Sequence, residues 1–404
     1  MIKFELRRNL IYPLQYLIWT LARDFLTMFI KFLFTFTDSY AYIPFMFLGE
    51  IFLGGLFHLY LKKIMPKKSD NKEQYFMAIK LIKNEEDDND YFAPLDSKVK
   101  IIILIFFASV FDAISFLLDA VITPKFKSLS ASLSMRLYGF ATISASFTYV
   151  YALKLPLFRH HKFSLSVIGF CLIVVIISEY FFQTMDLTMN YLKLTMAIVS
   201  IIISQILISC QDSIEKYLFE YNYMNPFVVL MYEGLFGFFI SFLNLIDENY
   251  FHDFVDIYKD KNSKEFALFI FLLIVFIILS GGKNLFRIVT TKIYSPMVTT
   301  LLDYVLNPIY LIYYYGAQGD FKKEDGKLDV AYFTINIIIS LIISFFGCVY
   351  NEFIILFFCG LERNTHDQVS KRASSKIDEN LTELMKFDES TEMSMNDETN
   401  SVIK

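Results

Sequence analysis

The sequence contains little cysteine, histidine, glycine or tryptophan, and these scarcities argue against several kinds of site. Its 404 residues include four cysteines, five histidines, 14 glycines and one tryptophan. The cysteines lie within or at the ends of apolar blocks, without the spacing of a zinc site or a disulfide framework, so we expect them to be buried hydrophobic residues. The chain also lacks a His-Glu-x-x-His signature, a Gly-x-Ser-x-Gly elbow and the paired aspartates of an intramembrane protease. We therefore expect no enzyme activity, no catalytic or metal-binding residues and no cofactor.

Most of the chain consists of apolar blocks. Hydrophobic residues make up 55% of the sequence, whereas soluble domains contain about 45–50%. The blocks are about 18 to 25 residues long, the length that crosses roughly 30 Å of hydrocarbon as a helix. We predict an all-α membrane protein with ten transmembrane helices, in contact with the lipid bilayer. The predicted spans are residues 10–35, 40–61, 99–121, 129–153, 163–183, 191–214, 226–246, 265–289, 295–315 and 332–357.

The charged residues lie mainly in loops and tails and indicate the orientation. The net charge of −5 indicates no nucleic-acid partner, because it is not concentrated in a folded domain. The loop from Lys62 to Lys100 is rich in lysine, and the loop at 154–162 is also basic. Because loops rich in lysine and arginine stay in the cytosol, both termini are predicted to be cytosolic. The basic segment at 322–327 runs against this assignment.

The spans divide the chain into two five-helix units. Residues 1–9 form a cytosolic amino terminus, and residues 10–183 form the first unit, with a polar loop at 63–98. Residues 191–357 form the second unit. Residues 361–404 are charged and poor in aromatic residues, which predicts a disordered cytosolic tail.

A weak internal repeat links the second span to the seventh. The stretches "YIPFMFLGEIFLGGLF" (42–57) and "MNPFVVLMYEGLFGFF" (224–239) both place Pro-Phe before an apolar run and a glutamate beside glycine. These glutamates, Glu50 and Glu233, each lie about 10 Å inside the face where their span begins. Five is odd, so the units cross the membrane in opposite senses and form a 5+5 inverted-topology repeat. We predict that the two carboxyl groups line opposite ends of a central cavity and that at least one of them exchanges protons; a purely structural hydrogen bond is the alternative.

Other polar residues lie at membrane depth, where an unpaired charge is costly. Arg136 and Asp303 occupy corresponding spans, and we predict that they approach each other or share water in the central cavity. Gly54, Gly55, Gly234 and Gly237 are expected to let helices approach closely. The complete set of predicted cavity residues is Glu50, Asp112, Arg136, Gln205, Gln211, Glu233, Lys283, Asn284, Asp303 and Asn307.

The stretches "EGLFGF" (233–238) and "MFLGE" (46–50) resemble the drug/metabolite transporter superfamily, within it solute carrier family 35 and its F6-type branch, which is related to the chloroquine-resistance-transporter-like proteins. The similarity runs over about residues 40 to 355. Two positions depart from the pattern: Arg23-Asp24 replaces a small Gly-Ser pair, and Leu306 replaces an arginine. The resemblance implies a ten-helix inverted fold that works by alternating access. Many relatives lie in Golgi, lysosomal or vacuolar membranes.

Two classes of function remain open from the sequence. The first is a secondary active transporter of a small polar or charged solute, of nucleotide-sugar or metabolite type, in an endomembrane. Protons are a candidate coupling ion, and a homodimer is one assembly the sequence allows. The second is a non-transporting membrane scaffold or receptor with a signalling tail.

Overall fold

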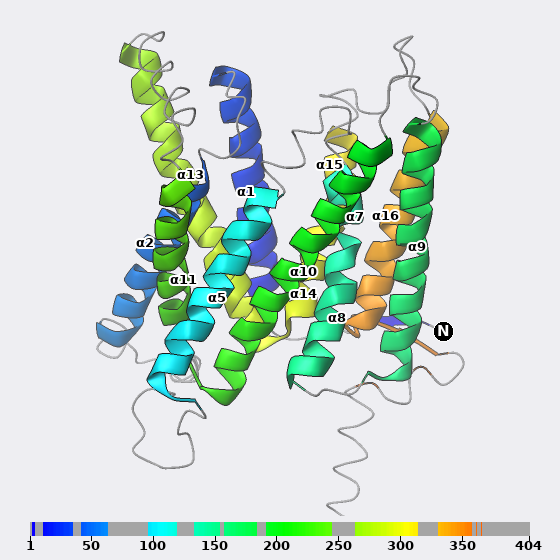
Figure 1. The fold of residues 1–404 in the computed structure, drawn as a ribbon, viewed down its shortest axis with the longest axis horizontal. Helices are drawn as coiled ribbons and strands as arrows, with labels where there is room; N and C mark the ends of the chain where they lie inside the picture. Colours follow the sequence, from blue (N-terminus) through cyan, green and yellow to red (C-terminus); the bar gives the residue numbers. More distant parts are fainter. Residues whose placement is uncertain are drawn as a thin grey trace, which may run out of the picture.

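The structure is a computed structural model (Figure 1). It describes residues 2–4, 11–34, 42–63, 96–118, 133–153, 157–183, 191–244, 263–313 and 330–357, together with Leu361 and Thr365. Several features singled out in the sequence lie outside the described residues: the polar loop over 64–95, the basic segment at 322–327, Cys359 and the tail beyond residue 365.

The described chain is almost entirely helical, and every predicted span contains helix. Spans four and nine are each divided into two helices, and the tenth ends at Tyr350 and not at residue 357. The helices are α1 (Ile11–Phe34), α2 (Ile43–Lys63), α5 (Lys98–Leu117), α7 (Leu133–Leu137), α8 (Gly139–Leu153), α9 (Arg159–Gln183), α10 (Tyr191–Tyr221), α11 (Pro226–Asn244), α13 (Ser263–Ile293), α14 (Pro296–Val305), α15 (Asn307–Tyr313) and α16 (Val330–Tyr350).

Within the described residues, six helices are long and apolar enough to cross a membrane: α2, α5, α9, α10, α13 and α16. Many of their large side chains are exposed, such as Phe170 and Ile177 on α9. Such an apolar exterior is stable in lipid and not in water. The chain is therefore a multi-pass helical membrane protein. The other predicted spans form helices that are shorter, broken or, as in α1, interrupted by the charges of Arg23 and Asp24.

The two broken spans have identifiable causes. Between α14 and α15, Pro308 has no backbone N–H to donate, so the helix stops and begins again. The backbone N–H groups of Ile309 and Tyr310 donate to Leu306 O at 3.0 and 3.2 Å. Between α7 and α8 the break falls at Tyr138, just before Gly139. Broken helices at membrane depth are tolerated where the freed backbone faces protein or a water-filled cavity.

The helices pack as pairs that run alongside each other. The main pairs are α2 with α11, α1 with α13, α5 with α10, and α9 with α16, and α13 also packs against α2 as α11 does against α5. Figure 1 shows these helices side by side in one bundle. Buried apolar residues of α2 and α13, including Phe47 and Phe276, form one core cluster. Another joins α9, α10 and α16 through Leu172, Ile198 and Ile343.

Two short strands depart from the all-α prediction. β1 (Ile2–Phe4) pairs antiparallel with β2 (Ile354–Leu356), with Ile2 opposite Leu356. The prediction missed this pair because β2 lies inside an apolar run that continues span ten. The pairing places the segment before α1 and the segment after α16 on the same side of the bundle.

Glycine allows α2 and α11 to approach closely. A Cβ built on Gly234 would lie 2.8 Å from Glu50 Cβ and 2.9 Å from Ile51 N. On α2, a Cβ built on Gly54 would lie 3.0 Å from Phe227 O. A side chain does not fit at Gly234, and at Gly54 it fits only if its neighbours shift, so the predicted packing role is confirmed for these two glycines. Gly55 is different, because a Cβ there would meet only Met231 Sδ at an ordinary 3.6 Å.

We expect Gly234→Val to destabilise the protein by about 1–3 kcal/mol, because the added methyl groups force α2 and α11 apart. Gly169→Ala on α9 is the matched control. Its Cβ would meet only Ile143 Cδ1, at an ordinary 3.7 Å, so stability should stay the same or rise slightly. Unfolding of both purified variants in detergent measures the difference. Equal stability of Gly234→Val and the unmodified protein would contradict the packing.

Candidate functional site

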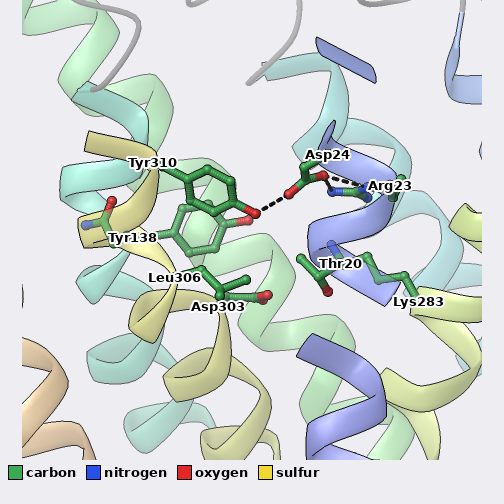
Figure 2. A pocket seen from close by; sticks show the side chains of 9 residues that line it. Thr20, Arg23, Asp24, Tyr138, Lys283, Asp303, Leu306 and Tyr310 are labelled. Carbon is green, nitrogen blue, oxygen red and sulfur yellow. Dashed lines mark hydrogen bonds and ion pairs between the residues drawn. The ribbon is translucent and has the colours of Figure 1, made fainter. Parts of the chain in front are cut away.

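A polar cavity of about 60 Å³ lies where α1 and α13 meet the two broken spans. A single water requires about 10–15 Å³ of such space, so the cavity holds a few waters or a small polar group. Figure 2 shows side chains converging on it from α1, α13, α14, α15 and the α7–α8 break. The lining residues are Thr20, Arg23, Asp24, Tyr138, Lys283, Asp303, Leu306, Asn307 and Tyr310.

Both acidic side chains of the cavity are held by tyrosine hydroxyls. Arg23 Nη2 lies 2.6 Å from Asp24 Oδ1, and the Tyr310 hydroxyl donates to the other oxygen of Asp24 (Figure 2). The Tyr16 hydroxyl donates to Asp303 Oδ1 at 2.6 Å. These bonds connect α1 to both parts of the broken ninth span. A change in the charge of either acid would therefore act on the contact between α1 and α14–α15.

Lys283 is the cation of the cavity that is left available. Within the described residues it makes no ion pair or hydrogen bond, and its ammonium lies 5.9 Å from the centre of the Tyr16 ring. Arg23, by contrast, is already engaged by Asp24. A lysine ammonium carries three donors on a flexible stem and binds carboxylate or phosphate groups readily. The Lys283 ammonium can therefore bind an anionic group in the cavity.

One turn further along α13, Arg287 lies at the centre of a second polar group, which we name the carboxylate cluster. Arg287 Nη1 lies 2.6 Å from Asp212 Oδ1, and Nη2 lies 2.6 Å from Glu215 Oε1. Glu233 Oε2 is more distant, at 3.9 Å from Nη2. Gln211 Nε2 also donates to Glu215 Oε1, at 3.2 Å. The cluster comprises Arg287 with the carboxyl groups of Glu50, Asp112, Asp212, Glu215 and Glu233.

Glu50 and Glu233 lie next to each other, so the prediction that they line opposite ends of a cavity is wrong. Gly234 packs directly against the Cβ of Glu50, and neither glutamate lines the cavity. The reason is that α2 and α11 pack along each other, which brings the two neighbouring positions together. Asn284 donates to Glu50. Neither carboxyl oxygen of Glu233 makes a hydrogen bond within the described part of the chain.

The predicted ion pair between Arg136 and Asp303 is also wrong. Arg136 Nη1 lies 2.7 Å from Glu179 Oε2 on α9, and it donates to the Tyr332 hydroxyl at 2.5 Å and to Asn336 Oδ1 at 3.3 Å. The Tyr332 hydroxyl in turn donates to Glu179. Arg136 is on α7, which packs against α9, whereas Asp303 on α14 faces α1.

Apart from Gln205, the remaining predicted residues divide between the two polar groups. Lys283, Asp303 and Asn307 line the cavity. Glu50, Asp112, Gln211, Glu233 and Asn284 belong to the carboxylate cluster or contact it. Gln205 is fully buried on α10 and does not line the cavity, and its side-chain amide has no hydrogen-bond partner within the described residues. The structure thus assembles two sites where the sequence predicted one.

Several buried charged residues were missed by sequence reasoning. Arg287 and Glu179 lie inside predicted spans, and the cost of an intramembrane charge was a signal that could have found both. Glu215 lies one residue beyond the predicted end of span six, and α10 continues to Tyr221. Arg23 and Asp24 were noted only as departures from a family pattern, although they line the cavity.

No protein-family model matches the chain, and no curated protein matches its sequence. What the fold and the site define is thus a class: a multi-pass helical membrane protein with a charged cavity and a buried carboxylate cluster.

Proposed function

We propose that the protein is a secondary active transporter that moves a small polar or charged solute across a membrane by alternating access. The observation that carries the proposal is the cavity itself, which lies between α1, α13 and two broken helices and contains the Lys283 ammonium. Intramembrane charges are costly and mark solute or ion pathways. Discontinuous helices that meet at a polar site are characteristic of transporter folds.

The helix packing supports a 5+5 inverted repeat as the architecture of this transporter. In such a repeat the first span corresponds to the sixth, the second to the seventh, and so on. The pair α1–α13 then corresponds to α10–α5, and α2–α13 to α11–α5, and all four pairs are in contact. Exchanging the two units converts the pair α2–α11 into itself, and likewise the pair α9–α16. Both of these pairs also pack together. The two broken helices are the fourth span and the ninth, which are equivalent positions.

The charges and size of the cavity constrain the solute. Lys283 would bind its anionic group, and a donor or a cationic group on the same solute would have to replace the bonds that Asp24 and Asp303 make to Tyr310 and Tyr16. The space of about 60 Å³ fits a few waters or a small group. A small metabolite with an acidic group fits this description directly. A nucleotide sugar would require a conformation with a wider cavity.

The carboxylate cluster supports protons as the coupling ion. Five carboxyl groups share one guanidinium, and like charges at close range in a dry interior cannot all be ionised. Glu233 makes no hydrogen bond within the described residues, and Arg287 is 3.9 Å away. Its negative charge is therefore the least stabilised in the cluster, and it is the member we expect to hold a proton. Because Lys283 and Arg287 lie one turn apart on α13, a proton arriving in the cluster would act on the cavity through one rigid helix.

The membrane and the family remain part of the proposal. The resemblance of "EGLFGF" and "MFLGE" to solute carrier family 35 supports a Golgi, lysosomal or vacuolar location. The lysine-rich loops support cytosolic termini, and the pairing of β1 with β2 agrees with two ends on one side.

Solute flux through the purified protein in sealed liposomes tests this function against a scaffold or receptor. A panel of radiolabelled amino acids, small organic acids, sugar phosphates and nucleotide sugars should reveal at least one class that exchanges across the membrane. Lys283→Met should abolish that flux, because it removes the available ammonium. Lys193→Met replaces an exposed lysine on α10 and should leave flux unchanged. Absence of flux for the whole panel in protein that is folded and inserted would favour the scaffold.

We expect Glu233→Gln to fold and insert, yet to lose the dependence of uptake on a pH gradient while retaining pH-independent exchange. Glutamine keeps the shape of the side chain and removes its titratable proton. Uptake with and without an imposed gradient measures the effect. Glu220→Gln, at a side chain 43% exposed, is the control and should keep the original profile. An unaltered profile in both Glu233→Gln and Glu50→Gln would rule out coupling through these two residues.

A further inference from the structure

Two adjacent histidines at the start of α9 face a glutamate beyond the end of α16. His160 and His161 lie in the first turn of α9, and Glu352 follows the last residue of α16 by two positions. One ligand atom from each of the three side chains lies within 4.8 Å of the other two. The group is separate from the cavity and from the carboxylate cluster.

The distances within this group suit ligands that share an ion. His160 Nε2 lies 3.3 Å from Glu352 Oε1, and the rings of His160 and His161 are 4.0 Å apart at their centres. Two ligands of a tetrahedral zinc ion, each about 2.0–2.1 Å from the metal, lie about 3.3 Å from each other. His161 Nδ1 accepts a long hydrogen bond of 3.3 Å from the Phe158 backbone N–H. Because this bond is weak, a metal ion could replace it at little cost.

His160 is buried, and apart from the 3.3 Å approach of Glu352 its ring nitrogens make no polar contact in the described part of the chain. Its side chain is 3% exposed, and neither ring nitrogen makes a hydrogen bond within the described residues. Buried polar atoms are nearly always hydrogen-bonded, and an exception calls for an explanation such as an ion. His161 and Glu352 are only partly buried, which leaves a path for an ion from solvent.

The backbone of Glu352 directs its carboxyl group back toward α9. Glu352 has a φ of 60°, its N–H donates to Val349 O, and Phe353 N–H donates to Cys348 O. This is the Schellman pattern that ends many helices, and the position Glu352 occupies is normally glycine. A non-glycine residue with positive φ is uncommon and is found at functional sites.

We propose that His160, His161 and Glu352 bind one divalent transition-metal ion of the zinc class. Two imidazoles and a carboxylate form a three-ligand zinc set that leaves a fourth position for water. Imidazole ligands favour zinc, copper, iron and nickel over magnesium and calcium. The ion would join the beginning of α9 to the end of α16, two helices that already pack along each other. This inference does not depend on the proposed transport function.

Titration of the purified full-length protein with ZnCl₂, followed with a competing fluorescent chelator, tests the proposal. The protein is purified without a polyhistidine tag, so that the tag adds no ligands. Glu352→Gly removes the carboxylate ligand and supplies the residue that a positive φ prefers, so this variant should fold. His161→Ala removes an imidazole, and His58→Ala removes a histidine outside the group as the matched control.

The expected result is one tightly bound Zn²⁺ per chain, with a rise in the unfolding temperature on addition of Zn²⁺. Glu352→Gly and His161→Ala should each weaken binding by more than about tenfold, the loss typical of removing even an outer partner of a metal site. His58→Ala should bind as the unmodified protein does. Absence of saturable Zn²⁺ binding, or binding that is unaffected in both Glu352→Gly and His161→Ala, would overturn the proposal.

Discussion

Arg287→Met should destabilise the folded bundle by about 3–5 kcal/mol, because it leaves Asp212 and Glu215 buried without the cation that both contact. Removing one partner of a buried ion pair is far more costly than removing the whole pair, since the remaining charge has lost its compensation. Unfolding of the purified protein by SDS in mixed micelles gives the free-energy difference.

The matched variant combines Arg287→Met with Asp212→Asn and Glu215→Gln. It removes the stranded negative charges and should recover a large part of the lost stability. Arg287→Lys keeps a positive charge but cannot contact two carboxylates at once with a planar fork, so its stability should be intermediate. If Arg287→Met were as stable as the unmodified protein, Arg287 would not be the centre of the cluster.

The second large effect concerns Arg136 and Glu179, which are both almost fully buried and lie 2.7 Å apart. Arg136→Met and Glu179→Gln should each cost about 3–5 kcal/mol. The double variant should cost clearly less than the sum, because the two residues interact directly. The same SDS titration of all four proteins completes the double-mutant cycle.

Asp303→Asn provides the control for this cycle. Asp303 is bonded to Tyr16 on α1 and not to Arg136, so the effects of Arg136→Met and Asp303→Asn should add within about 0.3–0.5 kcal/mol. A large coupling of Arg136 with Asp303, and none with Glu179, would restore the pairing first predicted from the sequence and contradict the structure.

The positions of the helices could be predicted from the sequence because they depend on local properties. Apolar blocks of spanning length indicated helix in every predicted span, and Pro226 marked the beginning of α11. The break at Leu306 was also encoded locally, by Pro308, although it was not predicted. The pairing of β1 with β2 joins opposite ends of the chain, and no local pattern specifies such a partner.

The partners of the charged residues could not be predicted, because they depend on how helices are rotated and where they cross. Membrane depth alone suggested Arg136 with Asp303. The structure instead turns Arg136 toward Glu179 and Tyr332. Depth also placed Glu50 and Glu233 symmetrically, but only the packing of α2 on α11 shows that they are neighbours.

Access to the cavity from each side of the membrane tests the central claim of alternating access most directly. Thr20 lines the cavity on α1 and is 3% exposed. Thr20→Cys is introduced into protein whose native cysteines are replaced by serine, in sealed vesicles of known orientation. The control is Leu14→Cys, at a position 56% exposed on the apolar exterior of α1. A charged, membrane-impermeant thiol reagent is then applied from one side at a time.

Alternating access predicts that the reagent modifies Thr20→Cys from either side. Modification from one side should then prevent reaction from the other, because a single cavity is exposed in turn. Leu14→Cys, which faces lipid, should react from neither side. Reaction of Thr20→Cys from one side only, under every pH gradient and solute tested, would contradict the account and identify the cavity as the closed vestibule of a receptor or scaffold.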